Sequence, residues 1–320
     1  RHVDIMKLPV LLQPQNQQKG NYKVRLDPSV FMCDAAPTWN LSYDADPELA
    51  KWIGNADFRR ALSLGIDREQ LNETFWLGTG VPGAVAPAED SPYSPGPQYR
   101  TMWATYDAKK ANEMLDKIGL NKKDGDGFRL RTDGKGRLTI DLTTYVGFLQ
   151  TAQIAEMIRD QWRKIGIQAN VQEVDRNTAR QRSLENTLQN CIEMVWTSED
   201  LLLMAQNVFP VGARSFVGSK YGLWYESGGK QGMVPPPKVQ EVMNLYTLLP
   251  SLPDKDFQET VKKIWSIIID EVWVIGTVGF SPANSGVRVV KNNMGNIPDR
   301  LLNAHATPLR SRPDTYYFKS

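Results

Sequence analysis

Residues 55–80, NADFRRALSLGIDREQLNETFWLGTG, decide the predicted fold because they encode two short helices joined by a tight turn. Asn55 suits the N-cap of the first helix, because its side chain can accept hydrogen bonds from free backbone N–H groups. Apolar residues then recur at helical spacing: Phe58, Ala61, Leu62, Leu64 and Ile66. We expect Arg59 and Arg60 on the solvent-facing side. Asp67 begins the second helix, which ends at the glycines that close the segment.

Strand-like and helix-like segments alternate outward from this pair. Alternating apolar and polar residues predict strands at residues 138–145, 167–174 and 191–196, and a further strand is predicted at 273–280. Helical spacing predicts helices at residues 106–118, 151–165, 177–186 with Asn177 as cap, 238–249 and 254–269. Short β-prone runs punctuated by Pro28 and Pro37 predict short or edge strands before the pair. The alternation predicts an α/β fold with a mixed sheet flanked by helices.

The composition limits the class of protein. The chain has 320 residues, of which 41% are hydrophobic and 23% charged, and its net charge is +2. A balanced, dispersed charge gives no electrostatic reason to expect binding to nucleic acid. The most apolar stretch, residues 264–278, is interrupted by Asp270 and Glu271, so we expect no transmembrane segment. Residues 1–5 resemble the interior of a fold, and we expect the sequence to begin inside a longer protein.

Residues that could carry catalysis or bind metal are sparse. The two histidines, His2 and His305, lie near opposite ends of the sequence and away from any Cys, Asp or Glu cluster. This argues against a histidine-based triad and against a zinc site. The segment 124–127, Asp-Gly-Asp-Gly, suggests calcium, but an EF-hand register would place the cation Lys122 at the first ligand position. We therefore interpret the segment as a turn and expect neither metal nor cofactor.

The two cysteines leave one question open. A bridge between Cys33 and Cys191 would close a long loop and stabilise the fold by roughly 4–5 kcal/mol. Two buried free thiols are the alternative, and the sequence does not decide between them.

Candidate ligand-binding residues follow the predicted strand at 191–196. Strand ends are where α/β folds place their sites, so the residues after this strand are candidates for ligand contact. An aromatic pair with polar neighbours, Trp224 and Tyr225, also suits stacking and hydrogen bonding to a sugar or peptide. The predicted ligand-binding residues are Trp196, Thr197, Ser198, Glu199, Asp200, Trp224 and Tyr225.

Several motifs in order resemble the family 5 extracellular solute-binding proteins, the oligopeptide, dipeptide, nickel and oligosaccharide receptors of ABC importers. They are FRRALSLGIDRE at 58–69, YDAKKANEMLD at 106–116, DGDGF at 124–128 and WRKIGI at 162–167. Two later segments, YGLWYESGGK at 221–230 and IGTVG at 275–279, look like a branch often linked to oligosaccharides. The resemblance implies a lobe of the type II periplasmic-binding-protein fold.

The resemblance also implies a domain plan and partners. Family members are much longer, so residues 1–270 would form the second ligand-binding lobe and residues 271–320 would return to a first lobe outside this chain. Ligand would bind between two lobes that close by a hinge motion. The protein would be exported to the periplasm or another extracytoplasmic space, and its partners would be ABC permease subunits and a small-molecule, peptide or oligosaccharide ligand.

At the ligand site this sequence departs from the peptide-binding pattern. In those relatives a strand end carrying Gly-Trp, one or two small residues and Asp meets the ligand amine. Trp196 matches the tryptophan, but Val195 stands for the glycine, Glu199 holds the spacing of the aspartate, and Asp200 lies one further. The departure favours another ligand class, with Trp196 stacking on the ligand and Thr197, Ser198 and Glu199 supplying hydrogen bonds.

Two other functions compete with the receptor. Clustered carboxylates and tryptophans expected in loops or at element ends, such as Trp224, would also suit a carboxylate-dependent glycoside hydrolase. A peptide-sensing or chaperone-like module could use the same cleft without transport.

Overall fold

The computed structural model describes residues 3–147, 149–284, 286–301 and 312–319. Its centre is a four-stranded sheet of β2 (Cys33–Trp39), β4 (Thr139–Tyr145), β5 (Gln168–Val174) and β6 (Asn190–Val195). The strand order is β2-β6-β4-β5; β4 is parallel to β5 and β6, whereas β2 is antiparallel to β6. The sheet is therefore mixed, and Pro37 lies in its edge strand β2, as predicted.

The helix pair forms where capping and periodicity predict it. Helix α4 (Ala56–Leu64) begins at Asn55, whose side chain accepts hydrogen bonds from the N–H groups of Asp57 and Phe58 at 2.9 and 3.3 Å. Helix α5 (Arg68–Trp76) begins at Asp67 and ends at Leu77, which adopts a left-handed conformation. The expectation of an exposed Arg59 was wrong. Arg59 is 2% exposed and donates to the carbonyl oxygens of Ile53 and Glu271, so tertiary contacts replace water.

Helix α8 (Thr151–Arg163) anchors one face of the sheet to the helix pair. Its residues Ile154, Ile158 and Trp162 are completely buried. Trp162 donates through Nε1 to the carbonyl of Leu62 at 2.9 Å and stacks on Trp39, with ring centroids 6.2 Å apart. Each such large apolar side chain contributes about 2–3 kcal/mol on burial.

Helix α9 (Arg176–Leu184) packs against β4 with a separate small cluster, which is formed by Ala179, Leu188, Cys191 and Phe216. Its N-cap is Asp175, which accepts from the N–H groups of Asn177 and Thr178. The predicted cap Asn177 was therefore wrong by two residues.

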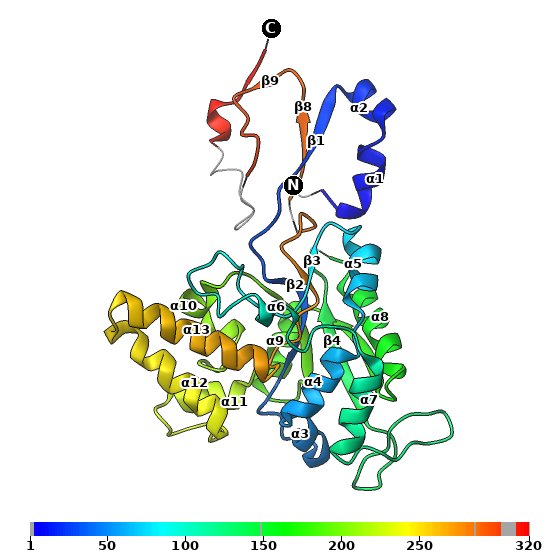
Figure 1. The fold of residues 1–320 in the computed structure, drawn as a ribbon, viewed down its shortest axis with the longest axis vertical. Coiled ribbons are helices and arrows are strands. Elements are labelled where there is room, and N and C mark those ends of the chain that lie inside the picture. Colours follow the sequence, from blue (N-terminus) through cyan, green and yellow to red (C-terminus); the bar gives the residue numbers. More distant parts are fainter. Residues whose placement is uncertain (1–2, 148, 285, 302–311, 320) are drawn as a thin grey trace.

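The remaining helices flank the body in Figure 1. They are α3 (Pro47–Ile53), α6 (Gln98–Thr101), α7 (Ala108–Lys117), α10 (Asp200–Leu203), α11 (Ser219–Glu226), α12 (Pro237–Leu248) and α13 (Asp254–Asp270). The predicted strand at 273–280 is mostly irregular. Only β7 (Val278–Gly279) is a strand, paired with β3 (Val81–Pro82), although Trp273 and Ile275 still hydrogen-bond to the backbone of β2.

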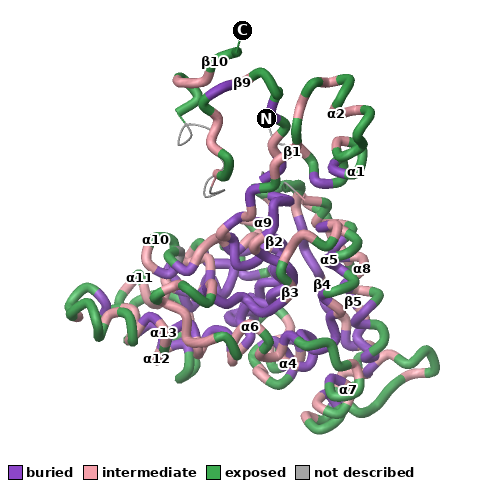
Figure 2. Tube along the Cα trace, turned by 45° about the horizontal axis from the view of Figure 1, so that its top comes forward, coloured by how far each residue is buried: buried purple, intermediate pink, exposed green. Residues whose placement is uncertain are grey.

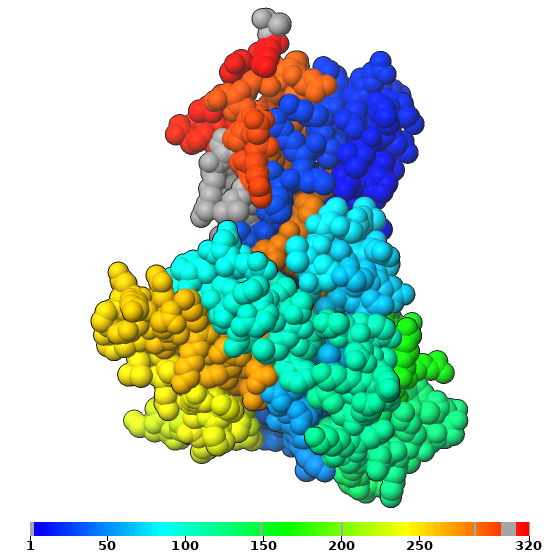
Figure 3. Space-filling view, in the orientation of Figure 1, coloured from blue at the N-terminus to red at the C-terminus, as the bar shows by residue number. Residues whose placement is uncertain are grey.

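Both ends of the chain leave the body on the same side (Figure 1). Strand β1 (Tyr22–Leu26) pairs antiparallel with β8 (Val287–Lys291), and β9 (Met294–Gly295) pairs with β10 (Tyr317–Phe318). The short helices η1 (Ile5–Lys7), α1 (Leu8–Leu11) and α2 (Pro14–Gly20) lie beside β1. This outer part is largely exposed or half-buried in Figure 2, and Figure 3 shows it as a smaller mass upon the body.

Candidate functional site

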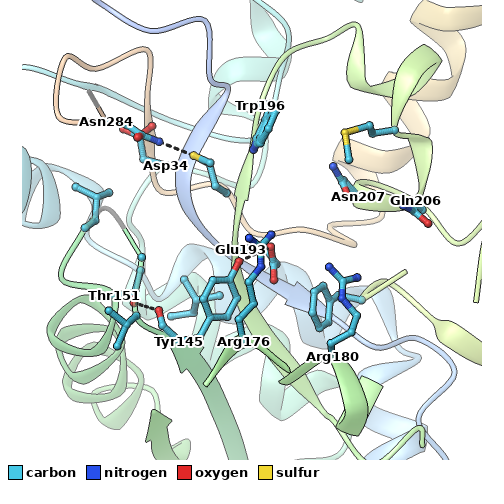
Figure 4. A pocket seen from close by; sticks show the side chains of 17 residues that line it. Asp34, Tyr145, Thr151, Arg176, Arg180, Glu193, Trp196, Gln206, Asn207 and Asn284 are labelled. Atoms are coloured by element: carbon cyan, nitrogen blue, oxygen red, sulfur yellow. Dashed lines mark hydrogen bonds between the residues drawn. The ribbon is translucent and has the colours of Figure 1, made fainter. Parts of the chain in front are cut away.

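A cavity of about 460 Å³ opens at the carboxyl ends of β4 and β6. Its wall includes Tyr145 from β4, Glu193 from β6, Trp196 just beyond β6, and Arg176 and Arg180 from α9. Figure 4 shows Tyr145, Glu193 and the two arginines grouped together, with Trp196 above them. We refer to this cavity as the strand-end pocket.

Glu193 and Tyr145 meet because β4 and β6 are parallel neighbours whose odd-numbered residues share a face. The Tyr145 hydroxyl donates to Glu193 Oε2 at 2.8 Å, and the Cys191 thiol lies 3.8 Å from Glu193 Oε1. Burial raises the pKa of Glu193, and burial beside this carboxylate also raises the pKa values of Tyr145 and Cys191. The hydroxyl and the thiol thus remain protonated donors at neutral pH.

Arg176 and Arg180 lie one helical turn apart on α9 and face this carboxylate. The Arg176 guanidinium lies over the ring of Tyr145, and that of Arg180 over the ring of Phe216, at 5.4 and 4.7 Å from the ring centroids. Both positive charges lower the pKa of Glu193, against the effect of burial. Planar guanidinium and carboxylate groups beside aromatic faces can hydrogen-bond to a ligand in fixed directions.

Asp34 enters the pocket wall from β2 through an irregularity in the sheet. Cys33 pairs with Val195 but Ala36 pairs with Glu193, so β2 contains one extra residue between these pairs. Such a β-bulge redirects side chains. Asp34 is 4% exposed, and its Oδ2 accepts hydrogen bonds from Trp76 Nε1 at 2.9 Å and Ser281 Oγ at 2.5 Å. Burial raises the pKa of the Asp34 carboxyl from 3.8 to about 7.

Trp196 is the predicted ligand residue that lies in the pocket wall. Its carbonyl accepts the N–H of Met32 at 2.7 Å, and its ring lies 6.0 Å from that of Phe31, with an angle of 45° between the planes. Trp196 is half-buried and contributes to the pocket wall.

Among the described side chains, the three that directly follow Trp196 are not part of the pocket wall. Ser198 is buried and its hydroxyl lies 3.2 Å from that of Ser91, while Thr197 Oγ1 accepts the N–H of Glu199 at 3.2 Å. Glu199 is exposed. Asp200 begins α10, but its side chain lies outside the described part of the structure.

The other predicted pair, Trp224 and Tyr225, lies on α11 rather than in a loop. The Tyr225 hydroxyl is 2.8 Å from Thr247 Oγ1 of α12. Neither residue belongs to the wall of the strand-end pocket.

Sequence reasoning missed Asp34, Glu193, Arg176 and Arg180. The position of Asp34 depends on a register shift between β2 and β6, which are neighbours in the sheet but far apart in sequence, so no local sequence pattern encodes it. For Glu193 a signal existed, since it is an acidic residue within an otherwise buried strand. The two arginines look like an ordinary solvated helix face until α9 is placed over the sheet.

The Asp-Gly-Asp-Gly segment is a turn, as expected. Asp124 Oδ1 accepts the N–H groups of Asp126 and Phe128, and Arg137 forms ion pairs with both aspartates. Among the residues described, no group of three or more His, Cys, Asp or Glu side chains could hold a metal ion. His2 and His305 lie outside the described residues.

Cys33 and Cys191 are both buried free thiols, which settles the question that the sequence left open. In the ladder Cys33 faces Val195 whereas Cys191 faces Thr38, so the two side chains lie far apart along adjacent strands.

A second hollow, of about 750 Å³, lies at the other end of the sheet strands. Its wall includes Tyr43, Tyr221, Pro236 and Trp273. Because β2 is antiparallel to β6, the residues after β2 reach the amino ends of the other strands. The two cavities are therefore separated by the length of the sheet.

The family model of the bacterial extracellular solute-binding proteins, family 5 Middle, matches residues 2–200. The chain belongs to this family of extracellular solute-binding proteins. The resemblance inferred from the sequence motifs is thereby confirmed.

Two curated relatives are similar to the chain. The periplasmic alpha-galactoside-binding protein of Rhizobium meliloti (strain 1021) is 24% identical over 256 residues, which cover 76% of this chain and 34% of that protein. The oligopeptide-binding protein AppA of Bacillus subtilis (strain 168) is 32% identical over 124 residues, covering 37% of this chain and 21% of AppA. The relatives are binding proteins rather than enzymes.

Solved structures share the fold. The oligopeptide-binding protein OppA matches with a TM-score of 0.76 and 26% identity over 96% of this chain and 50% of OppA. The binding protein MelB of Agrobacterium fabrum C58, solved with stachyose, matches with a TM-score of 0.68 and 18% identity, over 94% of this chain and 45% of MelB. The predicted α/β lobe of the type II periplasmic-binding-protein fold is confirmed, and the chain spans about half the length of these structures.

Within the described residues, no helix has the length and apolar character needed to cross a membrane.

Proposed function

We propose that this chain is the ligand-binding lobe of an extracytoplasmic receptor that delivers an oligosaccharide to an ABC permease. The observation that carries the proposal is the strand-end pocket, in which an aromatic face and planar polar side chains surround one cavity. Sugars present apolar C–H faces that stack on aromatic rings and hydroxyls that bond to planar polar groups. Trp196 supplies the face, and Glu193 and Arg176 supply such groups.

The acidic residue expected to read a peptide amine does not suit that task here. Glu199 has the right spacing from Trp196, but it is exposed and outside the pocket wall. The similarity to an alpha-galactoside-binding protein over 76% of the chain supports the same ligand class.

An oligopeptide is the second candidate. The pocket contains one buried carboxyl group, Asp34, and one half-buried, Glu193, as well as two arginines, an arrangement that could also bind the two ends of a zwitterion. The similarity to the oligopeptide-binding proteins AppA and OppA supports this alternative.

We also propose the domain plan that the family resemblance implies. Residues 1–270 would form the second lobe, residues 271–320 would return to a first lobe, and that lobe would close over the pocket. Export to the periplasm or another extracytoplasmic space and association with permease subunits belong to the same proposal. Exposed apolar side chains near the pocket, Val146 and Leu203, each 78% exposed, would then meet the closing lobe.

Isothermal titration calorimetry of the full-length protein tests the ligand class. The panel contains neutral oligosaccharides, including stachyose, and a nonapeptide. We expect saturable binding of at least one oligosaccharide and none of the peptide. Binding of neither class would contradict the receptor proposal. Turnover of a chromogenic glycoside that Glu199→Gln abolishes would favour the hydrolase instead.

A further inference from the structure

We propose that Asp34 is a specificity-determining residue of the strand-end pocket, where its Oδ1 accepts a hydrogen bond from a hydroxyl of a neutral oligosaccharide. This inference rests on the proposed function and deepens it. The sequence pattern suggested Glu199 as the carboxylate that hydrogen-bonds to the ligand, and this inference gives that role to a residue of β2 instead.

The first argument is the way in which the Asp34 side chain is fixed. Trp76 at the end of α5 and Ser281 after β7 both donate to Oδ2, so two different segments of the chain hold this oxygen. The bulge in β2 sets the backbone at the same point. A binding group held by neighbouring elements is preorganised, so little conformational entropy is lost when ligand binds.

The second argument is that Oδ1 has no hydrogen-bond partner among the described residues, although it is buried. An unsatisfied buried polar atom costs about 1–3 kcal/mol, and such atoms are rare without a functional reason. In the part of the chain that the structure describes, the other residues with such an atom are Trp39, Thr144, Asn190 and Trp265, none of which lines the strand-end pocket. Asp34 combines both properties, as a pocket-wall residue with an unfilled acceptor.

The third argument concerns the chemistry of the donor. An ammonium group in this pocket would meet the positive charges of Arg176 and Arg180, which also act on the Glu193 carboxylate. A hydroxyl carries no charge and avoids that repulsion, yet it donates well to a carboxylate shielded from water. A neutral oligosaccharide therefore satisfies Oδ1 at lower electrostatic cost than a peptide amine.

The environment of Asp34 also predicts a pH dependence. The other titratable groups in the pocket wall are Glu193 on β6, Tyr145, Arg176 and Arg180, and Cys33 precedes Asp34 on its own strand. The contacts from α5 and from the segment after β7 are Trp76 and Ser281, which do not titrate. Since the pKa of Asp34 is about 7, a ligand that requires the ionised carboxylate binds about tenfold more tightly at pH 8 than at pH 6.

The test is calorimetry of the full-length protein and two variants, Asp34→Asn and Glu199→Gln, against stachyose, the other neutral oligosaccharides and the nonapeptide. Each variant removes one carboxylate from the same end of the sheet, so Glu199→Gln is the matched control. We expect Asp34→Asn to weaken oligosaccharide binding at least thirtyfold and Glu199→Gln to change it less than twofold. Thermal melting checks that both variants fold.

The outcomes separate this inference from the proposed function. Oligosaccharide binding that Asp34→Asn leaves unchanged would overturn the role of Asp34 and leave the receptor standing. If the wild type binds the nonapeptide and Asp34→Asn abolishes that binding, Asp34 binds the peptide amine, which would overturn the inference that it binds a sugar hydroxyl. Binding of neither class by the wild type would overturn both proposals. If Asp34→Asn does not fold, a wild-type affinity that is flat between pH 6 and 8 would by itself contradict the inference.

Discussion

Buried polar side chains gather at both ends of the sheet strands, and each end contains an unfilled hydrogen-bonding group, but the two ends differ in where that group lies. Asn190, at the amino end of β6, lines neither cavity, whereas Asp34 lies in the wall of the strand-end pocket. At the amino ends of β4 and β6, Asn186 bonds to Asn40, Ser42, Asp44 and Ser219. We call these five residues the closed polar cluster. At the carboxyl ends, the strand-end pocket contains Asp34 with an unfilled Oδ1. This difference teaches that a group of buried polar side chains does not by itself indicate a binding site. The feature from which we infer one is an unfilled hydrogen-bonding group in the wall of a cavity.

The largest expected effect concerns Asp34 in the strand-end pocket and is a pH dependence of the free energy of unfolding. The pKa of Asp34 is 3.8 when unfolded and about 7 when folded, so the unfolded chain loses this proton first as pH rises. The group therefore destabilises the ligand-free protein progressively between about pH 4 and pH 7, by about 4 kcal/mol in total. Denaturant unfolding measures the free energy of unfolding at pH 5 and at pH 8. We expect it to fall more between these pH values for wild type than for Asp34→Asn, and an equal decrease in both proteins would contradict this prediction.

At the closed polar cluster, Asn186→Ala should destabilise the fold without changing ligand affinity. Asn186 has a φ of 60°, where asparagine is tolerated better than alanine, and its side chain makes hydrogen bonds at 2.7–3.4 Å to the cluster. Removing the hydrogen bonds to the buried partners Asn40, Ser42 and Ser219 costs about 3 kcal/mol. Urea unfolding measures the loss, and calorimetry on the folded variant measures affinity. If Asn186→Ala instead weakens ligand binding and leaves the free energy of unfolding unchanged, the proposed difference between the two ends of the sheet strands is wrong.

Trp196→Ala should weaken oligosaccharide binding about tenfold to thirtyfold, because the stacking face of the pocket disappears. Trp224→Ala is the matched control, since Trp224 lies on α11 outside the pocket wall. Its affinity should equal that of wild type. Equal losses in both variants would show that the sequence pattern had located a ligand site on α11 that the pocket geometry does not contain.

The smallest effect is expected from Arg176→Gln. The Arg176 side chain is exposed, so water already screens its charge, and we expect an affinity loss of only about threefold. Removing this charge should also raise the pKa of Glu193 further, because Arg176 lowers it in the native protein. Calorimetry between pH 5 and pH 8 would measure both effects, and a hundredfold loss of affinity would contradict the expectation that water screens this charge.

Local signals predicted most of the fold. Asn55 and Asp67 cap the helices at which they were expected, because a short polar side chain bonds its own helix start. The alternation at residues 138–145 predicted β4 within one residue. What failed depends on tertiary contact: Arg59 is buried by carbonyls that arrive from Ile53 and from Glu271, which is distant in sequence.

The site was predictable only where it followed directly from a strand end. Trp196 was found because it comes immediately after β6. Asp34 was not, because its place in the pocket depends on a bulge in the pairing of β2 with β6, and those strands are separated by more than 140 residues of sequence. Glu199 was chosen from its position after a strand end and from its spacing to Trp196, and neither feature reports whether a side chain is exposed.

A crystal structure of the full-length protein with an oligosaccharide bound tests the whole interpretation most directly. It should contain sugar density against the indole ring beyond β6, with one hydroxyl within 3.2 Å of the carboxylate that the β2 bulge presents. Sugar bound instead in the hollow beside Pro236 and Trp273, with that carboxylate still unpaired, would contradict it.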